Sequence, residues 1–271
     1  MRLGARVASA VVLAAVLAAA LWEGGVPIDV VAGLATGVGL YEYSGLAEGA
    51  ARVRPPFWVL YPLGGWLLYR SLLPGQVPTL EWGLGVAVVA GLLGALVLDR
   101  AGFVGWALAV GGALWLGLCL GYYLPVLNLH LSPGDHHGLR IVGTTLAASM
   151  LGDIAALFAG STLGRHRLAP RISPGKTVEG ALASMAATVG LFAGVSAWLL
   201  GYPWYHGVAL GALLSVAAQG GDLIESALKR SAGVKDSGRL VPGHGGLLDR
   251  MDSLVLLGPV VYCYLRAFAL P

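Results

Sequence analysis

A polar stretch near the C-terminal end, residues 220–252, carries the side chains best suited to chemistry on phosphates. It combines carboxylates, basic side chains, a histidine and paired glycines. Magnesium in proteins usually binds one or two carboxylates together with the phosphates of a substrate. Lysine and arginine form charge-assisted hydrogen bonds with phosphate oxygens. These residue types therefore indicate a site for a metal ion and phosphates, which the rest of the chain must position.

The first carboxylate of this stretch, Asp222, is expected on an apolar helix over residues 206–228. Asp222, Ser226 and Lys229 are spaced i, i+4 and i+7, so they share one helix face. A carboxylate more than one turn inside an apolar helix is costly unless it faces protein, a cation or water. An internal ion pair with Lys229 or Arg230 is the structural alternative. Further carboxylates follow and favour a metal or substrate role. They are Asp236, Asp249 and Asp252.

Asp249 is expected at the start of a last apolar helix over residues 250–268, where a carboxylate can also be a simple helix cap. Gly245 and Gly246 precede it. Adjacent glycines permit unusual backbone angles and let backbone N–H groups approach an anion. We therefore predict that Asp222 and Asp249 hold Mg²⁺, and that nearby cations neutralise phosphates or, alternatively, face lipid headgroups. These cations are Lys229, Arg230, Lys235, Arg239 and Arg250.

A second polar segment precedes an apolar helix expected over residues 178–200. Its tripeptide 175–177 resembles the end of a Walker A loop, but Pro170 stands where that pattern requires glycine, and no strand is expected before it. We therefore exclude a P-loop nucleotide-binding site. A serine, a lysine and a threonine at the start of a helix still make a good anion site. They are Ser173, Lys176 and Thr177.

Two further carboxylates lie within apolar segments. Asp153 falls inside a helix expected over residues 141–160, where an ionisable side chain indicates a functional site or a pairing with a structural partner. Glu42, near the inner end of a helix expected over residues 28–46, is a weaker candidate.

The composition predicts an all-α, polytopic membrane protein with a single domain over residues 1–271. The chain is 57% hydrophobic and only 11% charged, whereas soluble domains are about 25% charged. A spanning helix requires about 20 mainly apolar residues. We expect nine such helices, at residues 5–22, 28–46, 56–73, 82–98, 102–123, 141–160, 178–200, 206–228 and 250–268.

The basic residues predict how these helices are oriented. With the N-terminus in the cytosol, fourteen of the 17 lysines and arginines fall on the inner side. The other three are Arg70, Arg140 and Arg266. This asymmetry agrees with the positive-inside rule, and it places the polar stretch on the cytosolic face.

The polar stretch also carries a long sequence pattern. Residues 226–252 read S-x-x-K-R, four residues, K-D, and then P-G-H-G-G-x-x-D-R-x-D. This pattern resembles the signature of the phosphatidate cytidylyltransferases, also called CDP-diacylglycerol synthases. Residues 172–180 and the region of Asp153 are similar to the same family, although Leu157 stands where an aromatic residue would be expected and Gly175 where the family often carries a lysine. The resemblance is most specific over residues 150–253.

The resemblance implies a nucleotidyltransferase of phospholipid biosynthesis. It would convert CTP and phosphatidate into CDP-diacylglycerol and diphosphate, with Mg²⁺ bound by Asp222 and Asp249. A second, monovalent cation such as K⁺ is left open. The family implies a homodimer in the bacterial inner membrane with a cytosol-facing active site, and no nucleic-acid partner is expected.

Roles for individual residues follow as hypotheses. Asp222, Asp249, Lys229 and Lys176 would be catalytic. The substrate-binding set would be Ser173, Thr177, Ser226, Arg230, Lys235, His244, Gly245, Gly246, Arg250 and Asp153. Here Ser173, Lys176 and Thr177 would hold either the triphosphate or the phosphatidate headgroup, and His244 with the two glycines would shape the phosphate-facing turn.

Two alternative functions are weighed against this one. A CTP-dependent polyprenol or phytol kinase would use a similar nucleotide site but accept an alcohol. An ion-coupled transporter would use Asp153 and Asp222 as a relay, which predicts charges along a path across the bilayer. The unusual charges here instead gather toward one side.

Overall fold

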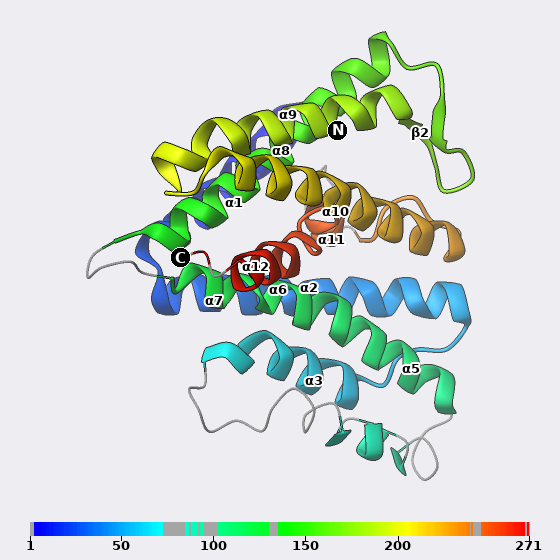
Figure 1. Cartoon of the computed structure of the whole chain (residues 1–271). Helices are drawn as coiled ribbons and strands as arrows, with labels where there is room; N and C mark the ends of the chain where they lie inside the picture. The colour runs from blue at the N-terminus through cyan, green and yellow to red at the C-terminus, as the bar shows by residue number, and fades with distance from the viewer. Residues whose placement is uncertain are drawn as a thin grey trace. The chain divides into compact units, whose positions relative to one another are not determined.

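The computed structural model describes residues 3–72, 85–86, 88–91, 93–94, 102–129, 135–238, 240, 245–268 and 270. These residues are mostly helical (Figure 1). They belong to two compact units, one of residues 1–124 and 228–251 and another of residues 125–227 and 252–271. The single domain over residues 1–271 stays a prediction.

The first unit is a group of helices built mainly from the N-terminal half of the chain. Its elements are α1 (Leu3–Glu23), α2 (Gly25–Ala51), α3 (Phe57–Tyr69), the 3-10 turn η1 (Arg70–Leu72), α5 (Gly102–Gly112), the π-helical segment η2 (Ala113–Leu118), α6 (Cys119–Gly121) and α11 (Leu248–Met251). The helix α7 (Tyr123–Leu127) leads into the second unit.

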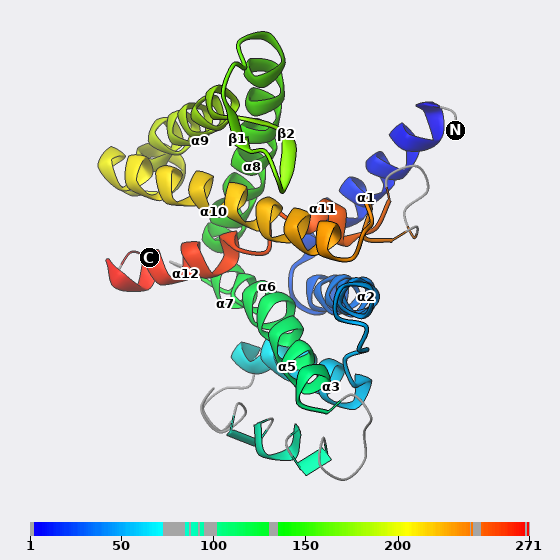
Figure 2. The ribbon, with the colours of Figure 1, turned by 90° about the vertical axis from the view of Figure 1, so that its right-hand side faces the viewer.

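Close packing of α3 against η2 forms the core of the first unit. Leu63 and Leu67 of α3 are buried with Ala113 of η2. A Cβ atom at Gly117 would overlap the backbone of Gly64, so the two helices approach as closely as glycine allows. Figure 2 shows α3 lying beside α5, which continues into η2.

The second unit consists of long helices and a short hairpin. Its elements are α8 (His137–Thr162), β1 (Arg167–Ala169), β2 (Ser173–Thr177), α9 (Val178–Leu199) and α12 (Leu257–Ala267). α10 (Trp204–Ser231) begins in this unit and ends in the first. α8 and α9 lie side by side, and the hairpin extends from one end of the pair (Figures 1 and 2).

The hairpin modifies the expectation of an all-α fold. β1 and β2 pair antiparallel, with Arg167 opposite Thr177 and Ala169 opposite Ser173. The expected helix start is therefore correct only for Thr177, whose side chain accepts a hydrogen bond from the Gly180 N–H group at 3.1 Å. Ser173 precedes Pro174. A residue before a proline favours the extended backbone of a strand. A strand precedes α9 where none was expected.

Four described helices are long and apolar enough to cross a membrane, which agrees with a polytopic membrane protein. They cover Gly102–Leu127, His137–Thr162, Val178–Leu199 and Trp204–Ser231. The expected span 82–98 lies largely outside the described residues. The number of nine spans and the cytosolic N-terminus stay predictions.

The expected continuous helix over residues 250–268 is wrong. α11 ends at Met251 and α12 begins at Leu257, so turns separate them. Pro259 explains where α12 starts, because proline is tolerated in the first turn of a helix but removes a hydrogen bond in its interior. With 11 residues, α12 alone falls short of the length that a hydrocarbon core requires.

Candidate active site

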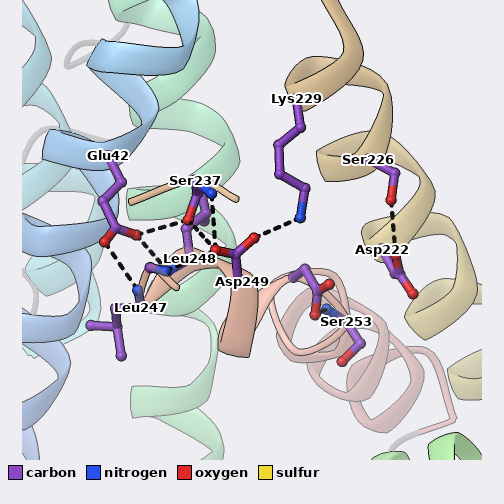
Figure 3. Close-up of polar contacts among 11 residues, drawn as sticks. Glu42, Asp222, Ser226, Lys229, Ser237, Leu247, Leu248, Asp249 and Ser253 are labelled. Atoms are coloured by element: carbon purple, nitrogen blue, oxygen red, sulfur yellow. Dashed lines mark hydrogen bonds and ion pairs between the residues drawn. The ribbon is translucent and has the colours of Figure 1, made fainter. Parts of the chain in front are cut away.

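The helix α10 carries the first group of candidate residues. It runs from Trp204 to Ser231 without interruption, slightly beyond the expected range. The Ser226 hydroxyl donates a hydrogen bond of 3.2 Å to Oδ1 of Asp222 (Figure 3). The expected shared helix face is therefore confirmed for these two residues.

Asp222 forms an ion pair with the hairpin of the second unit. Its Oδ2 lies 2.6 Å from Nζ of Lys176, and the two side chains are 34% and 22% exposed. The structural alternative expected for Asp222 was an internal ion pair with Lys229 or Arg230, which follow it on the same helix. The partner observed is Lys176, a residue that the sequence placed in a separate anion site. The structure therefore joins two of the predicted groups into one.

A cavity of about 510 Å³ surrounds this ion pair within the second unit. Its walls come from α8, the hairpin, α9 and α10. The polar residues that line it include Asp153, Arg167, Lys176, Thr177, Gln219 and Asp222. Asp153 and Asp222 therefore face one space, together with two cations of the hairpin. Alanines, glycines and Leu157 supply an apolar part of the same lining.

The first unit contains a second lysine–aspartate pair. Nζ of Lys229 lies 2.6 Å from Oδ1 of Asp249, and their side chains are only 14% and 9% exposed. Oδ2 of Asp249 accepts hydrogen bonds from the Ser237 N–H group at 2.9 Å, the Ser237 hydroxyl at 2.9 Å and the Gly246 N–H group at 2.8 Å (Figure 3). Both carboxylate oxygens are thus occupied by donors of the protein.

These contacts determine the charge of Asp249. Burial acts to raise the pKa of this carboxyl group, but the hydrogen bonds from Lys229, Gly246 and Ser237 outweigh burial. The pKa of Asp249 therefore lies below the ordinary value of 3.8. Asp249 is therefore ionised at neutral pH. It is not the cap of a long helix, because α11 spans only Leu248–Met251.

A second carboxylate, Glu42 of α2, reaches the same segment. It is 3% exposed. Its Oε1 accepts from the Leu247 N–H group at 3.0 Å, and its Oε2 accepts from the Leu248 N–H group at 2.8 Å. Oε2 also accepts from the Ser237 hydroxyl at 3.1 Å. The sequence ranked Glu42 as a weak candidate and did not single out Ser237, which no sequence pattern marks.

Of the paired glycines only Gly245 has the unusual backbone that was expected, and the N–H groups that follow it contact anions of the protein itself. Gly245 has a φ of 85°, in the left-handed region that favours glycine. The N–H groups of residues 246–248 donate to Asp249 and Glu42. The prediction that Gly245 and Gly246 bind substrate phosphate stays a prediction.

The other predicted substrate-binding residues have diverse positions. Arg230, Lys235 and Arg250 are exposed. Ser173 lies on β2, opposite Ala169. His244 and Arg239 lie outside the described residues. Arg167, which the sequence offered only as an inner-side cation, lines the cavity.

The donor atoms of the two pairs suit a hard cation. Mg²⁺ prefers oxygen ligands and keeps part of its shell for water and substrate phosphates. Asp222, Asp153 and the Ser226 hydroxyl supply oxygens in the second unit, and Asp249 does so in the first. Among the described residues, no group of three or more His, Cys, Asp or Glu side chains is arranged to hold a metal. The donor types are those that Mg²⁺ prefers, and in this structure Lys176, Lys229 and N–H and O–H groups of the protein engage the two carboxylates.

Comparisons with known proteins identify the family. Residues 4–268 match the model of the cytidylyltransferase family. The phosphatidate cytidylyltransferase of Brucella suis is 36% identical over 274 residues, covering 98% of this chain and 94% of that protein. The phosphatidate cytidylyltransferase of Bacillus subtilis is also 36% identical, over 76% of this chain and 78% of that protein. The chain therefore belongs to the cytidylyltransferase family and is a nucleotidyltransferase.

Proposed function

We propose that this protein is a phosphatidate cytidylyltransferase, which converts CTP and phosphatidate into CDP-diacylglycerol and diphosphate. The observation that carries the proposal is the match of nearly the whole chain to a relative with that name, at 36% identity. The two lysine–aspartate pairs support it, because they combine carboxylates and cations as a phosphoryl-transfer site requires.

The proposed reaction is a displacement at phosphorus. An oxygen of the phosphatidate phosphate forms a bond to the α-phosphorus of CTP, and the bond from that phosphorus to the bridging oxygen of diphosphate breaks. The attacking group is already an anion, so little general-base help is required. The site must instead neutralise and align two anions.

The cavity of the second unit is suited to hold one of these anions. Lys176 and Arg167 supply positive charge, and Thr177 supplies a hydroxyl group. The apolar part of the lining fits the glycerol and first methylenes of a lipid, and the polar part fits a phosphate. Whether the phosphate belongs to phosphatidate or to CTP, the recognition chemistry is the same.

Mg²⁺ would be held by Asp222 and Asp249, with Asp153 beside Asp222. When bound, it would stabilise negative charge that develops on the phosphate oxygens. Lys176 and Lys229 orient the two carboxylates, and both ammonium groups can hydrogen-bond phosphates. The exposed cations Arg230, Lys235 and Arg250 would attract the triphosphate and the departing diphosphate.

The proposed setting is the cytosolic face of a bacterial inner membrane, with nine spans and a cytosolic N-terminus. The distribution of lysine and arginine supports this orientation. Such a site would let the lipid tail stay in the bilayer while CTP arrives from water. The family resemblance supports a homodimer.

The test is an assay of purified protein with labelled CTP and phosphatidate, with and without Mg²⁺. Label at the α-phosphate should enter the lipid product only when Mg²⁺ is present, and label at the γ-phosphate should leave as diphosphate. Transfer of γ-label to an added polyprenol, without α-label in lipid, would overturn the proposal in favour of a CTP-dependent kinase.

A further inference from the structure

The carboxylate of Glu42 lies far in sequence from the residues it holds. It belongs to α2, yet its three hydrogen bonds go to Ser237, Leu247 and Leu248 (Figure 3). A carboxylate that is 3% exposed is costly to bury unless donors satisfy it. Here two backbone N–H groups and one hydroxyl do so. Glu42 therefore holds a segment of two described pieces, residues 237–238 and 246–248.

The backbone of this segment closes around the carboxylate. A Cβ atom at Gly246 would lie 2.5 Å from Oε2 of Glu42. A Cβ atom at Gly238 would overlap Oε1. Gly246 does not have a positive φ, so its conformation alone does not require glycine. Glu42 fills the space at Gly238, and Glu42 together with Oγ of Ser237 fills the space at Gly246. Both glycines are therefore explained by the side chains that meet at this carboxylate.

Glu42 is coupled to Asp249 through a shared hydroxyl group. Oγ of Ser237 lies 3.1 Å from Oε2 of Glu42 and 2.9 Å from Oδ2 of Asp249. One hydroxyl has a single proton, so the two carboxylates compete for it. Oδ2 of Asp249 also accepts from the N–H groups of Ser237 and Gly246. The orientation that leaves Oδ1 of Asp249 for Lys229 therefore depends on the segment that Glu42 holds.

We propose that Glu42 is a positioning residue for nucleotidyl transfer. It holds residues 237–238 and 246–248 so that Asp249 keeps one oxygen on the backbone donors and presents the other to Lys229 and to the reactants. Glu42 acts through Ser237 and the start of α11 rather than by touching substrate. This inference rests on the role proposed above for Asp249.

The first test replaces Glu42 with glutamine, which keeps the size but turns an amide donor toward N–H and O–H donors. The purified Glu42→Gln protein should lose about 10- to 100-fold in kcat, as partners of metal ligands typically do, with little change in the KM for CTP. Hydrogen exchange of the amides of residues 246–248 should accelerate. The control is Glu48→Gln, a change at a half-exposed carboxylate of the same helix that pairs with Arg54. It should leave both readouts at wild-type values.

The second test separates positioning from mere support of the fold. Ser237→Ala removes the shared hydroxyl but leaves both backbone bonds of Glu42, so it should also lower kcat. The double variant should lose little more than Glu42→Gln alone, because the two residues act along one route. A purely structural role predicts a lower unfolding temperature, unchanged kcat per folded molecule and additive effects.

The outcomes distinguish this inference from the proposed role of Asp249. If Asp249→Asn protein keeps its turnover, the role of Asp249 is wrong. If Asp249→Asn is inactive while folded Glu42→Gln keeps wild-type kcat, the inference about Glu42 is wrong. Should Glu42→Gln fail to fold, wild-type kcat in Ser237→Ala would equally overturn it.

Discussion

The two lysine–aspartate pairs have the same length but different surroundings. Each has an N–O distance of 2.6 Å. Lys176 and Asp222 are 22% and 34% exposed and face a cavity. Lys229 and Asp249 are 14% and 9% exposed, and backbone donors surround the second oxygen of the carboxylate. The first pair is open and the second is enclosed.

If both carboxylates serve the proposed phosphate reaction, this difference prepares them in two ways. The open pair can exchange partners at little cost, because both groups are partly exposed and face a cavity. The enclosed pair cannot rearrange without leaving donors unsatisfied, so its geometry is set before substrate arrives. Pre-set charges of this kind contribute to catalysis because they need no reorganisation during the reaction.

The largest expected effect comes from breaking the enclosed pair. Asp249→Asn removes the charge that Lys229 faces in a buried setting, so the free energy of unfolding should fall by about 3 kcal/mol. Turnover should fall by more than about 100-fold. Thermal unfolding in detergent and the labelled-CTP assay measure the two effects. Unchanged stability would show that the pair is not enclosed in solution.

Breaking the open pair should separate activity from stability. Asp222→Asn should lower turnover by about 100-fold. The free energy of unfolding should change by less than about 1 kcal/mol, because partly exposed ion pairs contribute little. The same two measurements apply. A loss of stability as large as that of Asp249→Asn would remove the distinction between the pairs.

Acid should weaken the enclosed pair within a defined window. The pKa of Asp249 is lowered in the folded protein, so its contribution to stability is fully present above its unfolded pKa of 3.8. That contribution is lost as the pH falls through the lower folded pKa. Wild type and Asp249→Asn should therefore differ in unfolding temperature at pH 7 and converge in strong acid. A constant difference at every pH would contradict this assignment.

The exposed cations should have the smallest effect. Lys235 is exposed, so Lys235→Gln should raise the KM for CTP about two- to threefold at low salt and much less at high salt, because salt screens exposed charges. Turnover should not change. A salt-independent increase in KM would indicate a direct and shielded contact with the triphosphate.

Local geometry was predictable from the sequence, and long-range pairing was not. The hydrogen bond between the Ser226 hydroxyl and the Asp222 carboxylate follows from helical spacing alone. The pairing of Lys176 with Asp222 depends on how the hairpin packs against α10, which no residue spacing encodes. The same holds for Glu42 and Leu247, which are 205 positions apart.

The glycines beside Asp249 show that a local sequence pattern can indicate an anion-binding backbone without identifying the anion. Glycines beside Asp249 correctly indicated backbone N–H groups that face an anion. The anions in the structure are carboxylates from other parts of the chain, which the sequence did not connect to them. The break before α12 could be predicted from a local signal, because Pro259 in the sequence indicates the start of a helix.

The fit between Glu42 and its two glycines has a consequence for how this segment can change by mutation. Because a Cβ atom at position 238 would occupy the space of the Glu42 carboxylate, a change at either position alters the demand on the other. A larger residue at 238 is compatible only with a shorter residue at 42. In genetic terms the two positions are epistatic, so variation at one is constrained by a residue almost two hundred positions earlier.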